Sequence, residues 1–186
     1  TRARILDAAV RRFAVVGYDG ASVDDICSEA GVSKGAFYHH YPTKQAIFLA
    51  LMQGWLKLID MGMDAARKDT VPETLMHMTN LLPGVFAAAE DRLPMFLEFW
   101  LQASRDETIW KAMIAPYHHY QDQFAKLVED GMAEGSLKAT DSRVAAQVIV
   151  SLAVGLVLQG VLDPHGADWE KTARESMHIL MIGLAK

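Results

Sequence analysis

Apolar residues recur at helical spacing along almost the whole chain. Ile5, Ala9, Phe13 and Val16 share one face of an α-helix, and Gly17 is expected to end that first helix. No stretch alternates apolar and polar residues over the length of a strand. The six prolines are spaced like breaks between helices. The pattern predicts an all-α protein with about nine helices.

Helix starts can be placed where a short polar side chain precedes an apolar pattern. Thr70 with Glu73, and Ser104 with Glu107, have the spacing of capping boxes. Asp141 precedes a long apolar pattern, where its carboxylate can accept backbone N–H groups. We therefore expect helices to begin at these three places.

Residues 22–44 contain two short helices separated by a tight turn. Ser22 is expected to cap the first helix. The apolar face of that helix consists of Val23, Ile26, Cys27 and Ala30. Gly31 then suits the left-handed position that ends a helix, and Ser33 caps the second helix at once. Two helices joined by so short a turn are typical of a helix-turn-helix.

Two lysines stand where helix electrostatics disfavour a cation. Lys34 and Lys44 each follow an N-cap residue, Ser33 and Thr43, at the positive end of a helix dipole. A phosphate bound at the same place would attract both the dipole and the lysine. Gly35 is a poor helix former, and its small size would let the second helix approach base edges. These features indicate a DNA-binding surface.

Residues 2–51 as a whole resemble the N-terminal domain of the TetR family of transcriptional regulators. The matching positions are 5–9, Phe13, Gly17, Tyr18, Ser22, Val23, Ile26, 30–35, Phe37, Tyr38, His40, Tyr41 and Lys44. Two positions depart from the family pattern, because Tyr41 stands where Phe is common and Ala36 where Thr is common. The rest of the chain resembles the family in length and helical character.

The resemblance implies roles for the matching residues. Lys34, Gly35 and Ala36 would face the bases, and Phe37 would anchor the recognition helix in the core. The remaining predicted DNA-binding residues are Ser22, Ser33, Tyr38, His39, His40, Thr43 and Lys44. The resemblance also divides the chain into a DNA-binding domain, residues 1–45, and a ligand-binding and dimerisation domain, residues 46–186.

All ten methionines and all four tryptophans lie beyond residue 51. Such adaptable and aromatic side chains form ordinary cores, and they also line pockets for apolar or aromatic ligands. Both interpretations stay open for each residue. The candidate pocket residues are Met61, Phe96, Phe99, Trp100, Trp110, Tyr117, His118 and Tyr120.

Residues 144–162 carry no charge and just reach the length of a bilayer span. Polar or small residues recur there every four positions, at Gln147, Ser151, Gly155 and Gln159, which favours a helix packed closely on another helix. We therefore expect a homodimer rather than a membrane span. The predicted interface consists of those four residues together with Met177, Leu180 and Met181.

Other chemistry finds little support. One cysteine, Cys27, excludes an internal disulfide, and its place on an apolar face predicts a buried hydrophobe. We find no catalytic motif, metal-ligand spacing or cofactor signature. Residues 1–50 carry six basic and five acidic residues, whereas the remainder is acidic. No signal-peptide pattern is recognisable, so we expect a cytoplasmic protein.

The sequence thus predicts a DNA-binding transcriptional regulator that is not an enzyme. By the family's usual logic, a dimer would repress from a palindromic double-stranded operator and be released by a small apolar or aromatic effector. The alternative is a helical ligand-binding or enzymatic protein that keeps the N-terminal helices only for packing and does not bind DNA.

Overall fold

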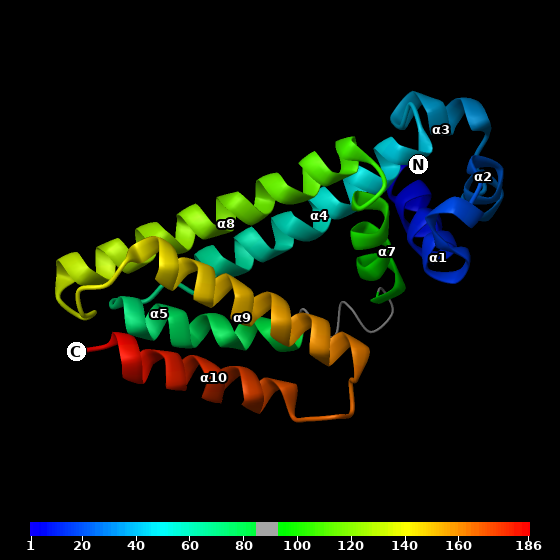
Figure 1. Ribbon diagram of the computed structural model, residues 1–186. Helices are drawn as coiled ribbons and strands as arrows, with labels where there is room; N and C mark the ends of the chain where they lie inside the picture. The colour runs from blue at the N-terminus through cyan, green and yellow to red at the C-terminus, as the bar shows by residue number, and fades with distance from the viewer. Residues whose placement is uncertain (85–92) are drawn as a thin grey trace. The chain divides into compact units, whose positions relative to one another are not determined.

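The computed structural model describes residues 1–84 and 93–186, without the side chains of residues 93–96 and 161. Over this part of the chain it contains nine α-helices, one short 3-10 helix and no strand, which confirms the predicted all-α class (Figure 1). The helices are α1 (Arg2–Gly20), α2 (Val23–Ala30), α3 (Lys34–His40), α4 (Lys44–Ala65), α5 (Val71–Met78), η1 (Thr79–Leu81), α7 (Leu93–Ala103), α8 (Glu107–Glu134), α9 (Ser142–Leu162) and α10 (Trp169–Leu184).

Helix starts follow the capping rules at most of the expected places. Thr70 and Glu73 form the predicted capping box, and the carboxylate of Asp141 accepts backbone N–H groups at the start of α9. The prediction for α8 was wrong, because Asp106 caps that helix. The hydroxyl of Ser104 instead donates to the carbonyl of Leu101 in the preceding helix.

Gly17 interrupts α1 at the position where the sequence predicted that the helix would end. Its backbone adopts φ 73° and ψ 172°, outside the helical region, and one further turn follows to Gly20. A positive φ is costly for residues with a Cβ atom, so glycine suits this break. The backbone carbonyls of Tyr18 and Ala21, which follow the break, accept hydrogen bonds from the side chain of Lys44.

The chain packs into two compact units. The first unit consists of Thr1–Leu58 with Asp91–Ile114, and the second consists of Ile59–Glu90 with Ala115–Lys186. This division falls away from the expected boundary at residues 45 and 46, because α4 and α8 each contribute to both units. The division describes packing, so the extent of a DNA-binding domain over residues 1–45 stays a prediction.

The first unit has an aromatic core that joins α1, α3, α4 and α7. The rings of Phe13 and Phe48 lie 5.6 Å apart in an edge-to-face arrangement, and Phe99 of α7 lies 4.5 Å from Phe48. Phe37 of α3 is fully buried in the same core. Residues far along the chain therefore complete the packing of the N-terminal helices.

The second unit has a core built from α5, α8, α9 and α10. Its buried side chains are Val71, Leu75, Leu127, Val128, Leu137, Ala145, Ile149, Met177 and Met181. A hydrogen bond also joins the segment between α8 and α9 to the end of α10, because Lys138 N donates to Leu184 O at 2.8 Å. The C-terminal helix is thus part of this core.

Two helical stretches, Lys44–Ala65 and Ser142–Gly160, are long and apolar enough to cross a membrane by length and composition alone. The second overlaps the uncharged segment singled out in the sequence. Core and interface helices of proteins outside membranes meet the same criteria.

Candidate functional site

The turn between α2 and α3 is a helix C-cap centred on Gly31. Its φ of 61° and ψ of 44° are left-handed, as the sequence predicted. The N–H groups of Gly31 and Val32 donate to carbonyls at the end of α2, with Val32 N lying 3.0 Å from Cys27 O. From α1, the guanidinium of Arg4 donates to the carbonyl of Gly31 at 3.0 Å. The local sequence therefore fixes the direction in which α3 leaves α2.

Hydroxyl groups hold the starts of three helices in the first unit. Ser22 Oγ accepts from Asp25 N at 3.0 Å, Ser33 Oγ from Ala36 N at 3.2 Å, and Thr43 Oγ1 from Ala46 N at 3.0 Å. The predicted DNA-binding residues Ser22, Ser33 and Thr43 thus have capping roles in the free protein. The Ser22 hydroxyl also donates a hydrogen bond to the Asp25 carboxylate, and this bond lowers the pKa of that carboxyl. The backbone N–H of Ser22 makes a second, smaller contribution in the same direction.

One face of α3 is exposed and carries most of the predicted recognition residues. Lys34, Gly35, Tyr38 and His39 are exposed, whereas Ala36 and His40 are half-buried. Phe37 lies on the opposite face and has no exposed surface. The helix is therefore anchored by one aromatic side chain while its other face is open to a partner.

Lys34 forms an ion pair at the entrance of α3. Its Nζ lies 2.6 Å from the Oδ1 of Asp24, in the first turn of α2. The hydrogen bond to Asp24 and the carboxylate charge raise the pKa of Lys34. In the free protein a carboxylate therefore compensates this lysine at the helix start, where the sequence suggested a phosphate.

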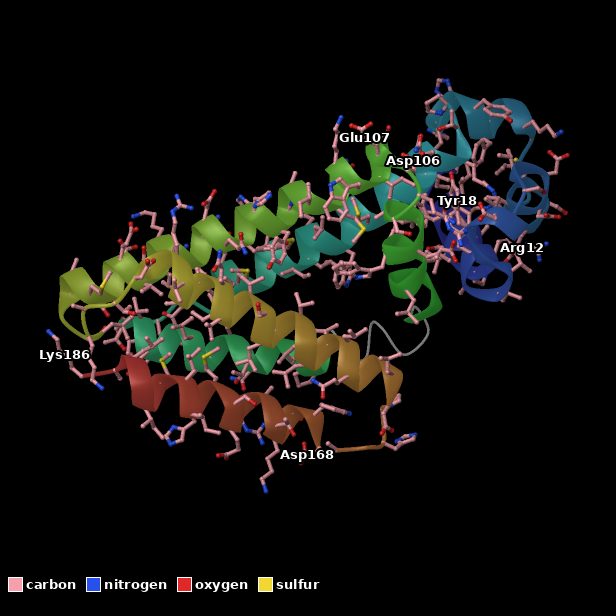
Figure 2. All side chains as sticks on the ribbon, viewed as in Figure 1. Arg12, Tyr18, Asp106, Glu107, Asp168 and Lys186 are labelled. Carbon is pink, nitrogen blue, oxygen red and sulfur yellow. The ribbon has the colours of Figure 1, made fainter. Side chains whose placement is uncertain are left out.

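Lys44 is compensated in another way. Its Nζ donates to the carbonyls of Tyr18 and Ala21, at 2.6 and 3.0 Å. It also lies 4.3 Å from the centre of the ring of Tyr18, which is labelled in Figure 2. These carbonyls follow the break in α1, where the end of a helix attracts a cation. The position of Lys44 thus has a structural reason that needs no phosphate, and its DNA contact stays a prediction.

The candidate pocket residues in the described part of the chain divide between the two units. Phe99, Trp100 and Trp110 belong to the first unit, where Phe99 is buried in the aromatic core. The others in the described part of the chain, Met61, Tyr117, His118 and Tyr120, belong to the second unit. The side chain of Phe96 lies outside the described residues.

A cavity of about 220 Å³ lies in the second unit, between α4, α5 and α8. Its lining includes Asp60, Met63, Asp64, Met78, Tyr120 and Phe124. Of the candidate pocket residues, this lining contains Tyr120 alone. Burial raises the pKa of Tyr120, and a hydrogen bond to Asp60 raises it further. Sequence analysis missed the two carboxylates because no motif marks acidic residues on a helix as pocket residues.

The predicted dimer residues differ in exposure. On α9, Gln147, Ser151 and Gln159 are exposed. On α10, Met177 and Met181 are instead buried in the core of the same unit, so they are not on an open face. The exposed apolar residues of α10 are Ile179 and Ile182.

Two further predictions concern reactive groups. Cys27 is buried as expected, and burial raises the pKa of its thiol. Among the described residues, no group of His, Cys, Asp or Glu side chains could hold a metal ion. The described helices thus offer a nucleic-acid face and a small cavity as candidate sites.

Two family models match the chain. Residues 5–51 match the model described as bacterial regulatory proteins of the tetR family, and residues 75–180 match the C-terminal domain of BetI-type transcriptional repressors. The first match covers α2 and α3 with their caps, and the second covers most of the second unit.

Individual proteins resemble the chain over most of its length. The A-factor receptor protein of Streptomyces griseus is 26% identical over 95% of this chain, which spans 61% of that receptor. The regulator BetI of Pseudomonas fluorescens is 24% identical, with 100% of this chain and 93% of BetI covered. A transcriptional regulator of Saccharomonospora viridis, solved with choline, superposes with a TM-score of 0.81 at 23% identity, covering 100% and 97% of the two chains.

The structural resemblance at this identity shows the shared fold, and the family models show the relationship. The chain spans less than two thirds of the A-factor receptor protein, so activity and partners do not follow from that relative. Since the BetI-type model alone matches more than half of the residues, the chain belongs to the TetR family of bacterial regulatory proteins.

Proposed function

We propose that the protein is a transcriptional regulator that binds double-stranded DNA through α3. The observation that carries the proposal is the division of α3 into a buried anchor, Phe37, and an exposed face with Lys34, Tyr38 and His39. A helix held in this way can enter the major groove without losing its packing. A DNA-binding role also agrees with membership of the TetR family, and it does not require the protein to be an enzyme.

The test is selection of genomic DNA fragments by the purified protein, followed by gel shifts at two salt concentrations. We expect retained fragments whose affinity falls steeply with salt, because lysines displace counterions from phosphates. Lys34→Ala should weaken binding and also relax sequence preference, since this residue starts the exposed face. Failure to retain any fragment at low salt would favour the alternative, a helical ligand-binding protein or enzyme without DNA.

We further propose that two copies pair through α9 and α10 in a four-helix arrangement. Apolar or small residues of α9, all exposed except the half-buried Gly155, recur at alternating spacings of four and three, the pattern of a helix seam. They are Val144, Val148, Ser151, Gly155, Leu158 and Leu162. On α10, which contacts α9, Ile179 and Ile182 are also exposed. A dimer would place two α3 helices on the two halves of a palindrome.

Ile179→Asp is expected to weaken this dimer at least about tenfold, because it would place a charge in an apolar interface. Ile179 is 69% exposed within the chain, so its replacement leaves the unit's own core intact. Sedimentation velocity over a concentration series measures the change. A matched change on the same helix, Glu175→Asp, keeps the charge and should leave the dimer unchanged. Wild-type protein that sediments as a monomer at every concentration would contradict the proposal.

We propose that the cavity of the second unit binds the effector, and that the effector has an apolar or aromatic body with a positive charge. Tyr120, Phe124 and the methionines supply an adaptable apolar wall. Asp60 and Asp64 add two carboxylates to a lining that also contains Arg67 and His119. Arg67 Nε lies 3.8 Å from Asp64 Oδ1, so Asp60 is the carboxylate left to attract a cation. Aromatic faces and carboxylates together favour organic cations. The choline bound to the Saccharomonospora viridis regulator is a ligand of this chemical class.

Choline is therefore expected to raise the thermal midpoint of the protein, by about 3–6 °C at ten times its dissociation constant. Its neutral carbon isostere, 3,3-dimethylbutan-1-ol, should have little effect. Asp60→Asn should weaken choline binding about tenfold, through loss of one nearby charge. Asp130→Asn is the matched control, because Asp130 pairs with Lys126 on the surface of α8, outside the cavity lining. Equal stabilisation by choline and its isostere would contradict a cationic effector.

We propose repression in the cytoplasm as the biological output, in keeping with the BetI-type repressor model that the chain matches. An effector would favour a state in which the two α3 helices no longer fit their half-sites. A reporter gene behind a selected operator tests the direction. Higher expression without the regulator is expected, and lower expression would identify an activator.

A further inference from the structure

The lysine and arginine side chains of residues 1–50 have partners within the chain. All six lysine and arginine side chains of residues 1–50 contact oxygen atoms or rings of the same unit. Their partners are Tyr41 for Arg2, Ala30 and Gly31 for Arg4, Glu29 for Arg11, Asp25 and Glu29 for Arg12, Asp24 for Lys34, and Tyr18 and Ala21 for Lys44. A DNA phosphate that approaches one of these cations therefore meets a side chain that already has an internal partner.

The six contacts differ in what their loss would cost. Arg4 and Lys44 bind backbone carbonyls at helix ends, so releasing them would leave those carbonyls without a partner. Lys34 and Asp24 form a surface ion pair, with side chains 61% and 64% exposed. Exposed pairs contribute little to folding and are opened easily. Lys34 is also the one lysine or arginine of residues 1–50 that belongs to α3. It is the cation that DNA can most readily take over.

We propose that Asp24 restrains sequence-independent DNA binding by competing with phosphates for Lys34. The proposal rests on the DNA-binding function proposed above. A phosphate that reaches Lys34 displaces the carboxylate and remains close to its negative charge, since the two side chains meet at 2.6 Å. Competition and like-charge repulsion then both lower the affinity for a bare phosphate backbone. The restraint needs no base contact, so it acts on DNA of any sequence.

The two helix starts explain how the carboxylate is held in place. Asp24 lies in the first turn of α2, where the helix dipole favours a negative charge, and Lys34 lies in the first turn of α3. The turn at Gly31, fixed by two backbone hydrogen bonds, sets the distance between those turns. The geometry of the helix-turn-helix therefore places the Asp24 and Lys34 side chains next to each other.

The experiment measures binding to a short fluorescent DNA duplex of mixed sequence by anisotropy, across a salt series. Asp24→Asn is expected to tighten binding about five- to tenfold at low salt, because the competitor and its charge are both removed. Asp7→Asn is the matched control: Asp7 is an exposed residue of α1, and its loss changes the net charge equally. That control should change affinity by less than about twofold, since the screened charge is not at the contact. Asp24→Glu keeps the carboxylate, so this variant should bind the duplex with the affinity of the wild-type protein.

A second pair of variants connects the effect to Lys34. If Asp24 acts through this lysine, Asp24→Asn should give no gain in a Lys34→Gln background. Equal gains from Asp24→Asn and Asp7→Asn, or a full gain without Lys34, would overturn the inference and leave the proposed function standing. Absence of any duplex binding by wild-type protein and all variants at low salt would overturn the proposed function itself. Circular dichroism melting verifies that each variant is folded.

Discussion

Phe37→Ala is expected to lower the free energy of unfolding by about 3–5 kcal/mol and to abolish DNA binding. The side chain is fully buried and packs beside Tyr41, with ring centres 6.2 Å apart. It anchors a helix of only seven residues, which has no stability of its own in water. Its loss would therefore leave a cavity and free α3 from the core. Urea unfolding monitored by circular dichroism measures the stability change.

The neighbouring aromatic residue is a matched control. Tyr38 is 51% exposed on the recognition face of α3, and its ring is in edge-to-face contact with Phe37. Tyr38→Ala should change the unfolding free energy by less than about 1.5 kcal/mol, the upper range for an aromatic pair, while still weakening DNA binding. If both variants lost similar stability, α3 would not be divided into an anchoring and a recognition face.

The local geometry of α2 and α3 could be predicted because its causes are local. A serine at each helix start and a glycine at the turn act on backbone groups within three or four residues. These rules place the starts of both helices correctly. The same reasoning failed at Ser104, because Asp106 lies two residues later and the structure uses its carboxylate as the cap.

Contacts between distant segments could not be predicted in the same way. An apolar helix face indicates burial, but it does not tell which partner covers it. Phe99 therefore looked like a pocket wall, although it packs on Phe48 more than fifty positions earlier in the chain. Met177 and Met181 looked like interface residues for the same reason, and the core of the second unit covers them. The carboxylates beside Tyr120 carry no pattern at all.

Lys44 combines a correct sequence signal with an incomplete explanation. The sequence shows a cation where the start of α4 disfavours one, and this requires a compensating negative group. The structure supplies two carbonyls from the end of α1, more than twenty positions away. No local rule could identify them. An unusual charge thus indicates that a partner exists without identifying it.

Lys44→Met is expected to lower the free energy of unfolding by about 1.5–3 kcal/mol, the range for hydrogen bonds that involve a charged group. The variant removes the ammonium that caps Tyr18 and Ala21 and keeps the length of the apolar stem. Thermal and urea unfolding measure this loss. Lys57→Met, at an exposed position of the same helix, is the control and should change stability by less than about 0.5 kcal/mol.

The same variant separates the cap from a phosphate contact. An ammonium has three donors, and in the free protein two of them bind carbonyls, so the third can bind a phosphate without breaking the cap. If it does, the slope of log affinity against log salt should become shallower by about 0.9 for each DNA-bound copy in the folded Lys44→Met protein. A loss of stability with an unchanged slope would limit Lys44 to holding α1 and α4 together. In that case, Lys34 would remain as the lysine of residues 1–50 that is proposed to contact DNA.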